Sequence, residues 1–179
     1  MNVTIRQLEI DEIPTIGEID KSDIVDARYV CRSQPDGLGL LLERKAVNPP
    51  EDEPNWGNVE EESAVFFGAF THDAPVGICA IVKLPDGKTA DLYTLQVDAG
   101  YRRQGIGAAL LAKEESECLI WGCTQLFTYT TFKASSLDFH LAKGYRIVGL
   151  QEPSVPTKNF AVTVAKQLEP NKPSGGDIQ

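Results

Sequence analysis

A glycine-rich turn near the middle of the chain joins a β-type pattern to a run of helix formers. Residues 90–97 have a strand pattern, the turn holds Gly105 and Gly107, and helix formers follow from Ile106. The first N–H groups of a helix have no partner inside the helix, and the helix dipole adds positive potential at that end. The junction at residues 97–111 therefore predicts a binding site for a phosphate or pyrophosphate.

Two better-known phosphate motifs do not fit this turn. Gly100 and Gly105 have the spacing of a triphosphate-binding loop, but Ile106 stands where that loop requires lysine. A dinucleotide fingerprint starting at Gly105 would need a small residue in place of Leu110 and an acidic residue about 20 positions further on. Residues 129–131 supply no such acid, so we expect a different class of phosphate-binding junction.

The remaining sequence alternates between strand and helix patterns. Helices are predicted from Asp11 through Ile19, over residues 106–121 and over residues 134–143, with glycine stops after the last two. Strands are predicted over residues 2–8, 37–42, 64–70, 77–84, 90–97, 126–130, 145–150 and 160–168. The pattern predicts an α/β (α+β) fold in which a hairpin and a third antiparallel strand lead into the glycine-rich turn.

The domain organisation follows from length and from two irregular segments. A chain of 179 residues with 42% hydrophobic and 24% charged residues suits one globular domain. Residues 48–58 contain three prolines and predict an irregular surface excursion, with no separate core. We expect one domain over residues 1–168 and a flexible tail over residues 169–179.

Charge and hydropathy limit the partners. No apolar run approaches the roughly 20 residues needed to cross a bilayer, and the N-terminus lacks the basic start and apolar stretch of a signal peptide. The net charge of −9 opposes attraction to nucleic acid or an anionic membrane and favours a cationic substrate. We therefore expect a cytoplasmic protein without nucleic-acid or membrane partners.

The cysteines do not indicate a metal site. The chain has four cysteines and two histidines, and the cysteines lack the paired spacing of metal ligands. We expect four reduced thiols and no bound metal.

The glycine-rich turn resembles the coenzyme A signature of the GNAT acetyltransferase superfamily. That signature is an Arg or Gln, two free positions, a Gly, one free position, and a Gly or Ala, matched here by Arg102, Arg103, Gln104, Gly105, Ile106 and Gly107. Residues 136–145 resemble the second hallmark of the family, a helix that carries Phe-Tyr and closes at Gly-Phe or Gly-Tyr. The order of predicted elements over residues 3–168 is also similar to the family's.

The resemblance implies a fold, a co-substrate and a reaction. The fold would be a central, mixed but mostly antiparallel, twisted sheet of about seven strands flanked by helices. Acetyl-coenzyme A would be the co-substrate, and a primary amine of a small molecule or protein would attack its thioester directly. The implied cofactor-binding residues, acting mainly through backbone groups, are Leu95, Gln96, Val97, Arg102, Arg103, Gln104, Gly105, Ile106, Gly107 and Ala108.

The resemblance also implies catalytic positions, with one departure. His140 stands where the family often has the tyrosine that protonates the coenzyme A thiolate. An imidazolium could supply that proton, although a histidine at a helix edge is equally compatible with simple packing. Asp91 and Tyr93, on the strand leading to the cofactor, are candidates for deprotonating the amine, with Glu62 as a further candidate; each is also compatible with a structural role.

The acceptor and the assembly are less constrained. Asp20, Asp23, Asp26 and Tyr29 lie where the family usually walls its acceptor pocket, which favours a cationic acceptor, although a solvated charge run explains them as well. Family resemblance is compatible with a homodimer. Because the tyrosine is missing, a coenzyme A-binding sensor without turnover is the alternative function. Transfer of a longer acyl group is a third hypothesis.

Overall fold

The computed structural model describes residues 2–16, 19–35, 40–53, 63–72, 74–151 and 161–169. Several sequence-based predictions therefore lie outside the described residues. These are Glu62 as a candidate base, most of the turn at residues 35–37, and the tail beyond Glu169.

A seven-stranded sheet forms the body, in the order β1-β4-β5-β6-β7-β9-β8. Neighbouring strands pair antiparallel except β6 and β7, which are parallel. The predicted mixed, mostly antiparallel sheet is thus confirmed. The strands are β1 (Thr4–Gln7), β4 (Val65–Thr71), β5 (Ala74–Lys83), β6 (Thr89–Val97), β7 (Gln125–Thr131), β8 (Arg146–Gln151) and β9 (Ala161–Gln167).

The two predicted long helices are confirmed as α2 (Ile106–Ile120) and α3 (Ala134–Ala142). Gly122 and Gly144 follow them with φ of 77° and 86°, a left-handed backbone that ends a helix and favours glycine.

The first predicted helix is mostly wrong. A 3-10 turn η1 (Ile10–Glu12) and one short helix, α1 (Ile13–Ile16), replace it. Glu9 rather than Asp11 is the N-cap, because Glu9 and Glu12 form a reciprocal capping box. Ile19 is buried by packing against the sheet and belongs to no helix.

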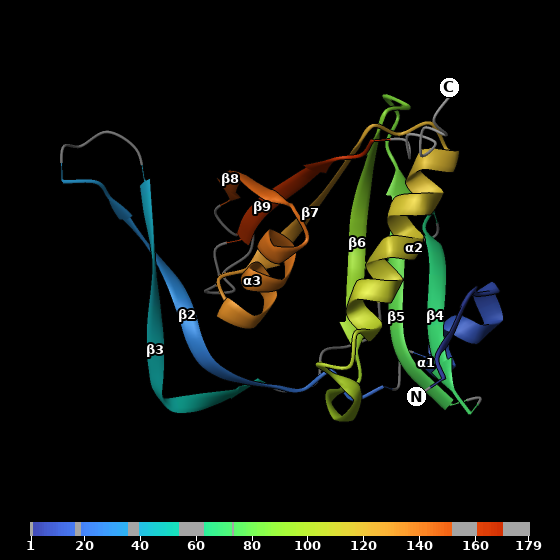
Figure 1. Ribbon diagram of the computed structural model, residues 1–179, viewed down its shortest axis with the longest axis horizontal. Coiled ribbons are helices and arrows are strands. Elements are labelled where there is room, and N and C mark those ends of the chain that lie inside the picture. The colour runs from blue at the N-terminus through green and yellow to red at the C-terminus, as the bar shows by residue number, and fades with distance from the viewer. Residues whose placement is uncertain are drawn as a thin grey trace, which may run out of the picture.

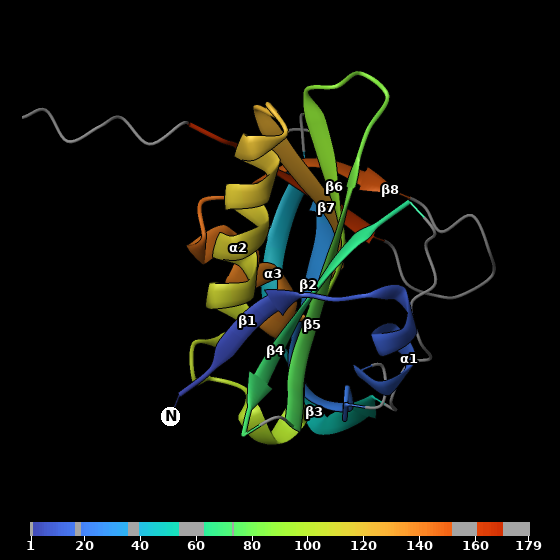
Figure 2. The ribbon, with the colours of Figure 1, turned by 90° about the vertical axis from the view of Figure 1, so that its right-hand side faces the viewer.

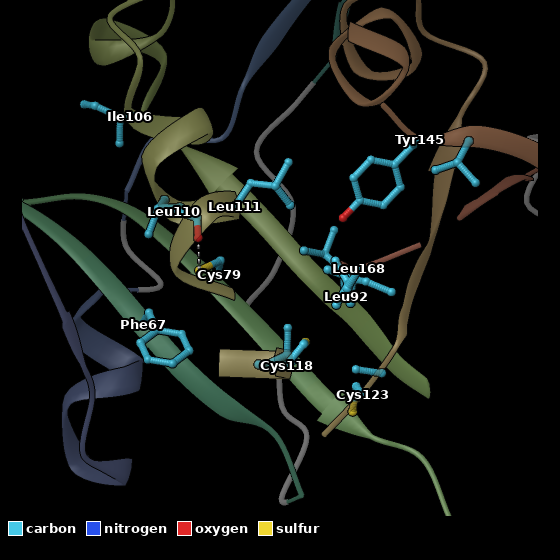
Figure 3. Close-up of a cluster of buried hydrophobic side chains, with 14 of the residues drawn as sticks. Phe67, Cys79, Leu92, Ile106, Leu110, Leu111, Cys118, Cys123, Tyr145 and Leu168 are labelled. Carbon is cyan, nitrogen blue, oxygen red and sulfur yellow. Dashed lines mark hydrogen bonds between the residues drawn. The ribbon is translucent and has the colours of Figure 1, made fainter. Parts of the chain in front are cut away.

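Helices α2 and α1 lie on opposite faces of the sheet (Figure 2). Helix α2 packs its Leu110 and Leu111 against Phe67 and other core residues on one face, as Figure 3 shows. Gly77 on β5 permits this close approach, because a Cβ there would lie 3.0 Å from Leu110 Cδ1. A smaller cluster around Phe66 fills the opposite face beside α1.

A long two-stranded hairpin extends from this body and was not predicted (Figure 1). It consists of β2 (Asp23–Ser33) and β3 (Leu40–Glu53), which pair antiparallel, and we call it the arm. The strand expected over residues 37–42 is confirmed for its described residues, 40–42, although β3 continues far beyond it. The irregular excursion expected over residues 48–58 is wrong for residues 48–53. Residues 48–53 belong to β3, where prolines are tolerated because a two-stranded ribbon leaves one edge of each strand unpaired.

Candidate active site

The sheet is split between β6 and β7. The two strands pair only from Thr89 to Asp91 on β6, whereas β6 keeps its β5 partner as far as Val97. Figure 1 shows β6 and β7 starting together and then diverging. The hydroxyl of Thr128 on β7 donates to the Leu92 carbonyl at 2.8 Å, one residue beyond the last pair, and so marks the apex of the split.

A bulge at Tyr93 accompanies the split. In the β5–β6 register, Ala80 opposes Thr94 but Ile81 opposes Leu92, so Tyr93 has no partner on β5. Bulges bend a strand and re-aim its side chains, and they are frequent beside active sites. Beyond the bulge, residues 93–97 present an edge of backbone groups that β7 does not cover in the described part of the chain.

The glycine-rich turn lies at the end of this open edge. Asp98 caps the 3-10 turn η2 (Ala99–Tyr101) by accepting from the Gly100 N–H at 2.9 Å. Gly105 then adopts φ of 86° as the N-cap of α2, and among the described residues no side-chain hydrogen bond caps this helix N-terminus. The N-terminus of this 15-residue helix therefore keeps N–H groups without intrahelical partners, the geometry that an anion-binding site requires.

The two arginines of the turn differ. Arg102 Nε donates to the Val97 carbonyl at 3.0 Å, and its Nη1 donates to Asp23 Oδ1 at 3.0 Å. Its guanidinium is thus engaged within the protein. Arg103 is exposed, with φ of 61°.

The other predicted cofactor residues line the same edge and turn. Leu95 and Val97 pack toward the α2 side, whereas Gln96 opposes Ile78 of the other face. Gly107 brings α2 close to β6 and α3, because a Cβ there would lie 3.5 Å from Val97 and 3.7 Å from Phe139. The Ile106 side chain is buried in the core, Ala108 is half-buried, and Gln104 is exposed.

Asp91 lies at the apex of the split, with its side chain half-buried. Its Oδ1 is buried and has no hydrogen-bond partner among the described residues. Burial raises the pKa of Asp91 to about 6, because desolvation disfavours the charged carboxylate. Tyr93, the other candidate base, is 44% exposed at the bulge.

His140 is buried in the last turn of α3, between the rings of Phe139 and Tyr145. Its Nδ1 lies 3.0 Å from the Ser136 carbonyl, and because a carbonyl only accepts, Nδ1 carries the proton. Nε2 is buried and has no hydrogen-bond partner among the described residues. Burial lowers the pKa of His140, so the neutral ring is favoured.

The predicted acidic wall of the acceptor pocket is only partly available. Asp20 accepts from the Ser22 N–H, and Asp26 is exposed. Asp23 contacts Arg102, and the Tyr29 hydroxyl donates to Asp138 Oδ1 at 2.6 Å.

Three residues near the split were not singled out in the sequence. Thr128 marks the apex, Asp98 caps η2, and Asp138 holds the arm through Tyr29. An aspartate directly before a glycine-rich turn is a recognisable cap, so Asp98 could have been found. Thr128 and Asp138 act across the fold and give no local signal.

Three general features complete the description. All four cysteines are free. No group of histidine, cysteine or acidic side chains in the described ranges is arranged to hold a metal ion. None of the helices in the part of the chain that the structure describes is long and apolar enough to cross a membrane.

Comparisons with known proteins identify a family and a shared fold. The sequence matches the model of the Acetyltransferase (GNAT) family over residues 35–145. A comparison with curated proteins gives no match.

Solved structures share the fold at low identity. A nourseothricin acetyltransferase has a TM-score of 0.77 at 16% identity, covering 93% of this chain and 99% of its own. A putative streptothricin acetyltransferase from Bacillus anthracis str. Ames, in complex with acetyl coenzyme A, has a TM-score of 0.77 at 19% identity with the same coverage. The ribosomal-protein-S18-alanine N-acetyltransferase from Escherichia coli has a TM-score of 0.66 at 16% identity, covering 98% of this chain and 100% of its own.

The split sheet, the open N-terminus of α2 and these likenesses define an acetyltransferase fold. Because the family model covers more than half of the sequence, the chain belongs to the GNAT acetyltransferase family.

Proposed function

We propose that this protein transfers the acetyl group of acetyl-coenzyme A to a primary amine by direct attack. The observation that carries the proposal is the continuous open edge of β6. It runs from half-buried Asp91 at the apex of the split to the uncapped N-terminus of α2. One end offers a proton acceptor and the other offers free N–H groups for a pyrophosphate.

Acetyl-coenzyme A fits this edge through backbone groups. The N–H groups at the start of α2 would hold the pyrophosphate, with the exposed Arg103 adding charge. Peptide groups of residues 93–97 would orient the pantetheine and acetyl end. Arg102 would act differently from the prediction, by fixing the Val97 carbonyl.

The chemistry requires a neutral amine. We assign Asp91 to remove the proton from the acceptor ammonium, since a carboxyl with a pKa of about 6 is ionised at pH 7 yet more basic than an ordinary aspartate. The amine nitrogen then bonds to the thioester carbonyl carbon and the C–S bond breaks, so that coenzyme A leaves as the thiolate. The nitrogen loses one proton as the amide forms, and this proton balances the one that the thiolate takes up. Tyr93 remains a second candidate for the base.

His140 remains the candidate for protonating the thiolate. Its unpartnered Nε2 is the ring nitrogen that would carry a transferable proton, because Nδ1 already donates to Ser136. The lowered pKa makes the imidazolium unfavourable, so a packing role is the alternative.

A cationic small-molecule amine is our preferred acceptor. The net charge of −9 favours cations, and the two neighbours named for nourseothricin and streptothricin match this chain over nearly its whole length. A protein amino terminus is the second candidate, because the S18-alanine enzyme also spans the chain.

The test separates the enzyme from the alternative, a coenzyme A-binding sensor. Calorimetry measures acetyl-coenzyme A binding, and release of free thiol measures turnover with a streptothricin, an aminoglycoside, spermidine, lysine and an alanine-initiated peptide. Binding with acetylation of at least one amine supports the enzyme. Binding without transfer to any amine supports the sensor, and competition between acyl chain lengths tests transfer of a longer acyl group.

Three further predictions concern the whole protein. The domain spans residues 1–168, the protein forms a homodimer, and it is cytoplasmic. Light scattering coupled to size exclusion measures the mass in solution, and a monomer at micromolar concentration would contradict the dimer.

A further inference from the structure

The arm crosses the open end of the split sheet. Strand β2 packs beside α3, and its Tyr29 N–H donates to the Phe132 carbonyl at 2.7 Å, just beyond the end of β7. At the start of β2, Asp23 contacts Arg102 in the turn that follows β6. Strand β2 therefore bridges the two sides of the opening.

Alternate residues of β2 face the body. Val25 and Ala27 are buried, whereas Asp26 between them is exposed. Because side chains alternate along a strand, Asp23 lies on the inward face with Val25 and Ala27. Its carboxylate points to the protein, and that of Asp26 points away.

Asp23 joins three segments that are distant in sequence. Its Oδ1 accepts from Arg102 Nη1 at 3.0 Å, and its Oδ2 lies 3.6 Å from Lys133 Nζ and 3.3 Å from Ser135 Oγ. Arg102 precedes α2, whereas Lys133 and Ser135 are at the start of α3. The side chain of Asp23 is only 23% exposed, so solvent screens these contacts incompletely.

Arg102 extends this contact to the cofactor edge. Its Nε holds the Val97 carbonyl while its Nη1 holds Asp23. A rigid, planar guanidinium couples the positions of its two acceptors. The root of the arm and the last residue of β6 are thus connected through one side chain.

We propose that Asp23 is a positioning residue that couples the cofactor turn to the arm, so that acetyl-coenzyme A binding orders the arm over the acceptor side. The inference rests on the proposed function for the identity of the ligand. It assigns Asp23 to holding Arg102, Lys133 and Ser135 together, and it removes Asp23 from the residues that would bind a cationic acceptor directly.

The physical consequence of losing the carboxylate is specific. In Asp23→Asn, Arg102 and Lys133 would face each other without the negative charge between them, which loosens the root of the arm. The backbone groups of the α2 N-terminus would be unchanged. The direct contacts to acetyl-coenzyme A should therefore be kept, and its affinity should fall only by the factor by which its binding no longer orders the arm, because coupling between sites is reciprocal. The acceptor KM should rise about tenfold, within the usual range of such coupling.

Hydrogen–deuterium exchange tests the coupling without needing an acceptor. Acetyl-coenzyme A should slow exchange in peptides covering residues 23–33 of the wild-type protein, and Asp23→Asn should lose this effect. Asp26→Asn is the matched control, with the same chemical change on the outward face of the same strand, and it should retain the effect. Asp23→Glu, which keeps the charge, should restore part of the protection.

A double-mutant cycle of Asp23→Asn and Arg102→Gln adds a second readout. If the coupling passes through the Asp23–Arg102 pair, acetyl-coenzyme A should protect the arm of the double variant no less than that of either single variant. If acetyl-coenzyme A still protected the arm fully in Asp23→Asn, or if Asp26→Asn lost the same protection, this inference would be overturned and the proposed function would stand. Failure of the wild-type protein to bind acetyl-coenzyme A would overturn the proposed function and this inference with it.

Discussion

The cofactor half of the protein and the arm are built in different ways. The cofactor half, β4 to β6 with α2, is an apolar core in which Phe67, Ile81 and Leu110 are fully buried. The arm buries only a few apolar residues, such as Val25 and Ala27, and it is also held by polar contacts, chiefly Asp23 with Arg102 and Tyr29 with Asp138. A ligand held by backbone groups needs a rigid scaffold, and the apolar core supplies it.

This difference has a consequence for the two halves of a transfer reaction. In the proposed function, the groups that would hold acetyl-coenzyme A are peptide N–H and C=O groups, which every sequence contains. The groups that would meet the acceptor are side chains on the arm and at the apex of the split. The cofactor half should therefore tolerate side-chain changes that preserve the backbone, whereas the acceptor side should respond to single polar substitutions.

Asp91 lies on β6 at the apex of the split, and its loss should have the largest effect on turnover. Asp91→Asn removes the proposed base while keeping the size of the side chain, so we expect kcat to fall about 10²- to 10⁴-fold with acetyl-coenzyme A affinity unchanged. Steady-state kinetics and calorimetry measure the two quantities.

The pH profile provides the control for this assignment. Because Asp91 must be ionised to accept a proton and its pKa is about 6, wild-type kcat/KM should fall as pH decreases through about 6. Asp91→Asn should lose that limb. If Asp91→Asn kept the full rate, Tyr93 or solvent would be the base that deprotonates the amine.

Substitution in the glycine-rich turn should impair only the binding of acetyl-coenzyme A. Gly105 has φ of 86° and Gly87 has φ of 68°, and a Cβ at either position would meet no atom within 4 Å. Valine at either should therefore cost similar backbone strain, roughly 1–2 kcal/mol. We expect Gly105→Val to weaken acetyl-coenzyme A binding by about tenfold or more, since the side chain would occupy the approach to the α2 N-terminus.

Gly87→Val is the matched control, because Gly87 lies in the turn before β6, at the opposite end of the strand from Val97. Calorimetry and thermal melting of both variants separate binding from strain. Equal loss of affinity in the two variants would mean that strain, and not access, governs binding.

The contrast also explains which elements the sequence predicts. The strands at residues 64–97 and helix α2 follow from local apolar periodicity and from glycines at their ends, which a single sequence displays. The arm lacks such a signal. Its β2 buries only alternate residues such as Val25 and Ala27 against distant segments, and its β3 contains Pro49 and Pro50, which indicate a loop when read locally.

The candidate site divides in the same way. The turn and its glycines are contiguous, so their role could be predicted. The engagement of Arg102 by Val97 and Asp23 could not, because Asp23 lies far from Arg102 in sequence. The same holds for Thr128, whose hydroxyl marks the split only because β7 lies beside β6.

Glu114 is an ionisable group inside the cofactor half. It is fully buried in α2, its two carboxylate oxygens have no hydrogen-bond partner among the described residues, and burial raises its pKa well above the usual value. The folded state therefore keeps a proton that the unfolded state releases above pH about 4.5. Stability should fall as pH rises from there toward the folded-state pKa, by up to about 1.4 kcal/mol per pH unit.

Urea unfolding from pH 4 to 8 measures this slope. Glu114→Gln, which cannot ionise, should flatten it, and Glu114→Leu should do the same while removing the unpartnered polar atoms. An unchanged slope in both variants would assign the pH dependence to other groups.

His140 belongs to α3, which contacts both regions, and its substitution should have the smallest effect on turnover. Because Nδ1 donates to Ser136 and burial lowers the pKa of the ring, little imidazolium is present at neutral pH to act as an acid. We expect kcat of His140→Ala to fall less than about tenfold, below the 10²- to 10⁴-fold range typical of acid catalysis, and His140→Tyr to match or exceed the wild type. Equal rates for all three proteins would remove His140 from the mechanism. A loss of 100-fold in His140→Ala, recovered in His140→Tyr, would instead establish proton donation at Nε2 and show that α3 contributes to the chemistry as well as to holding the arm.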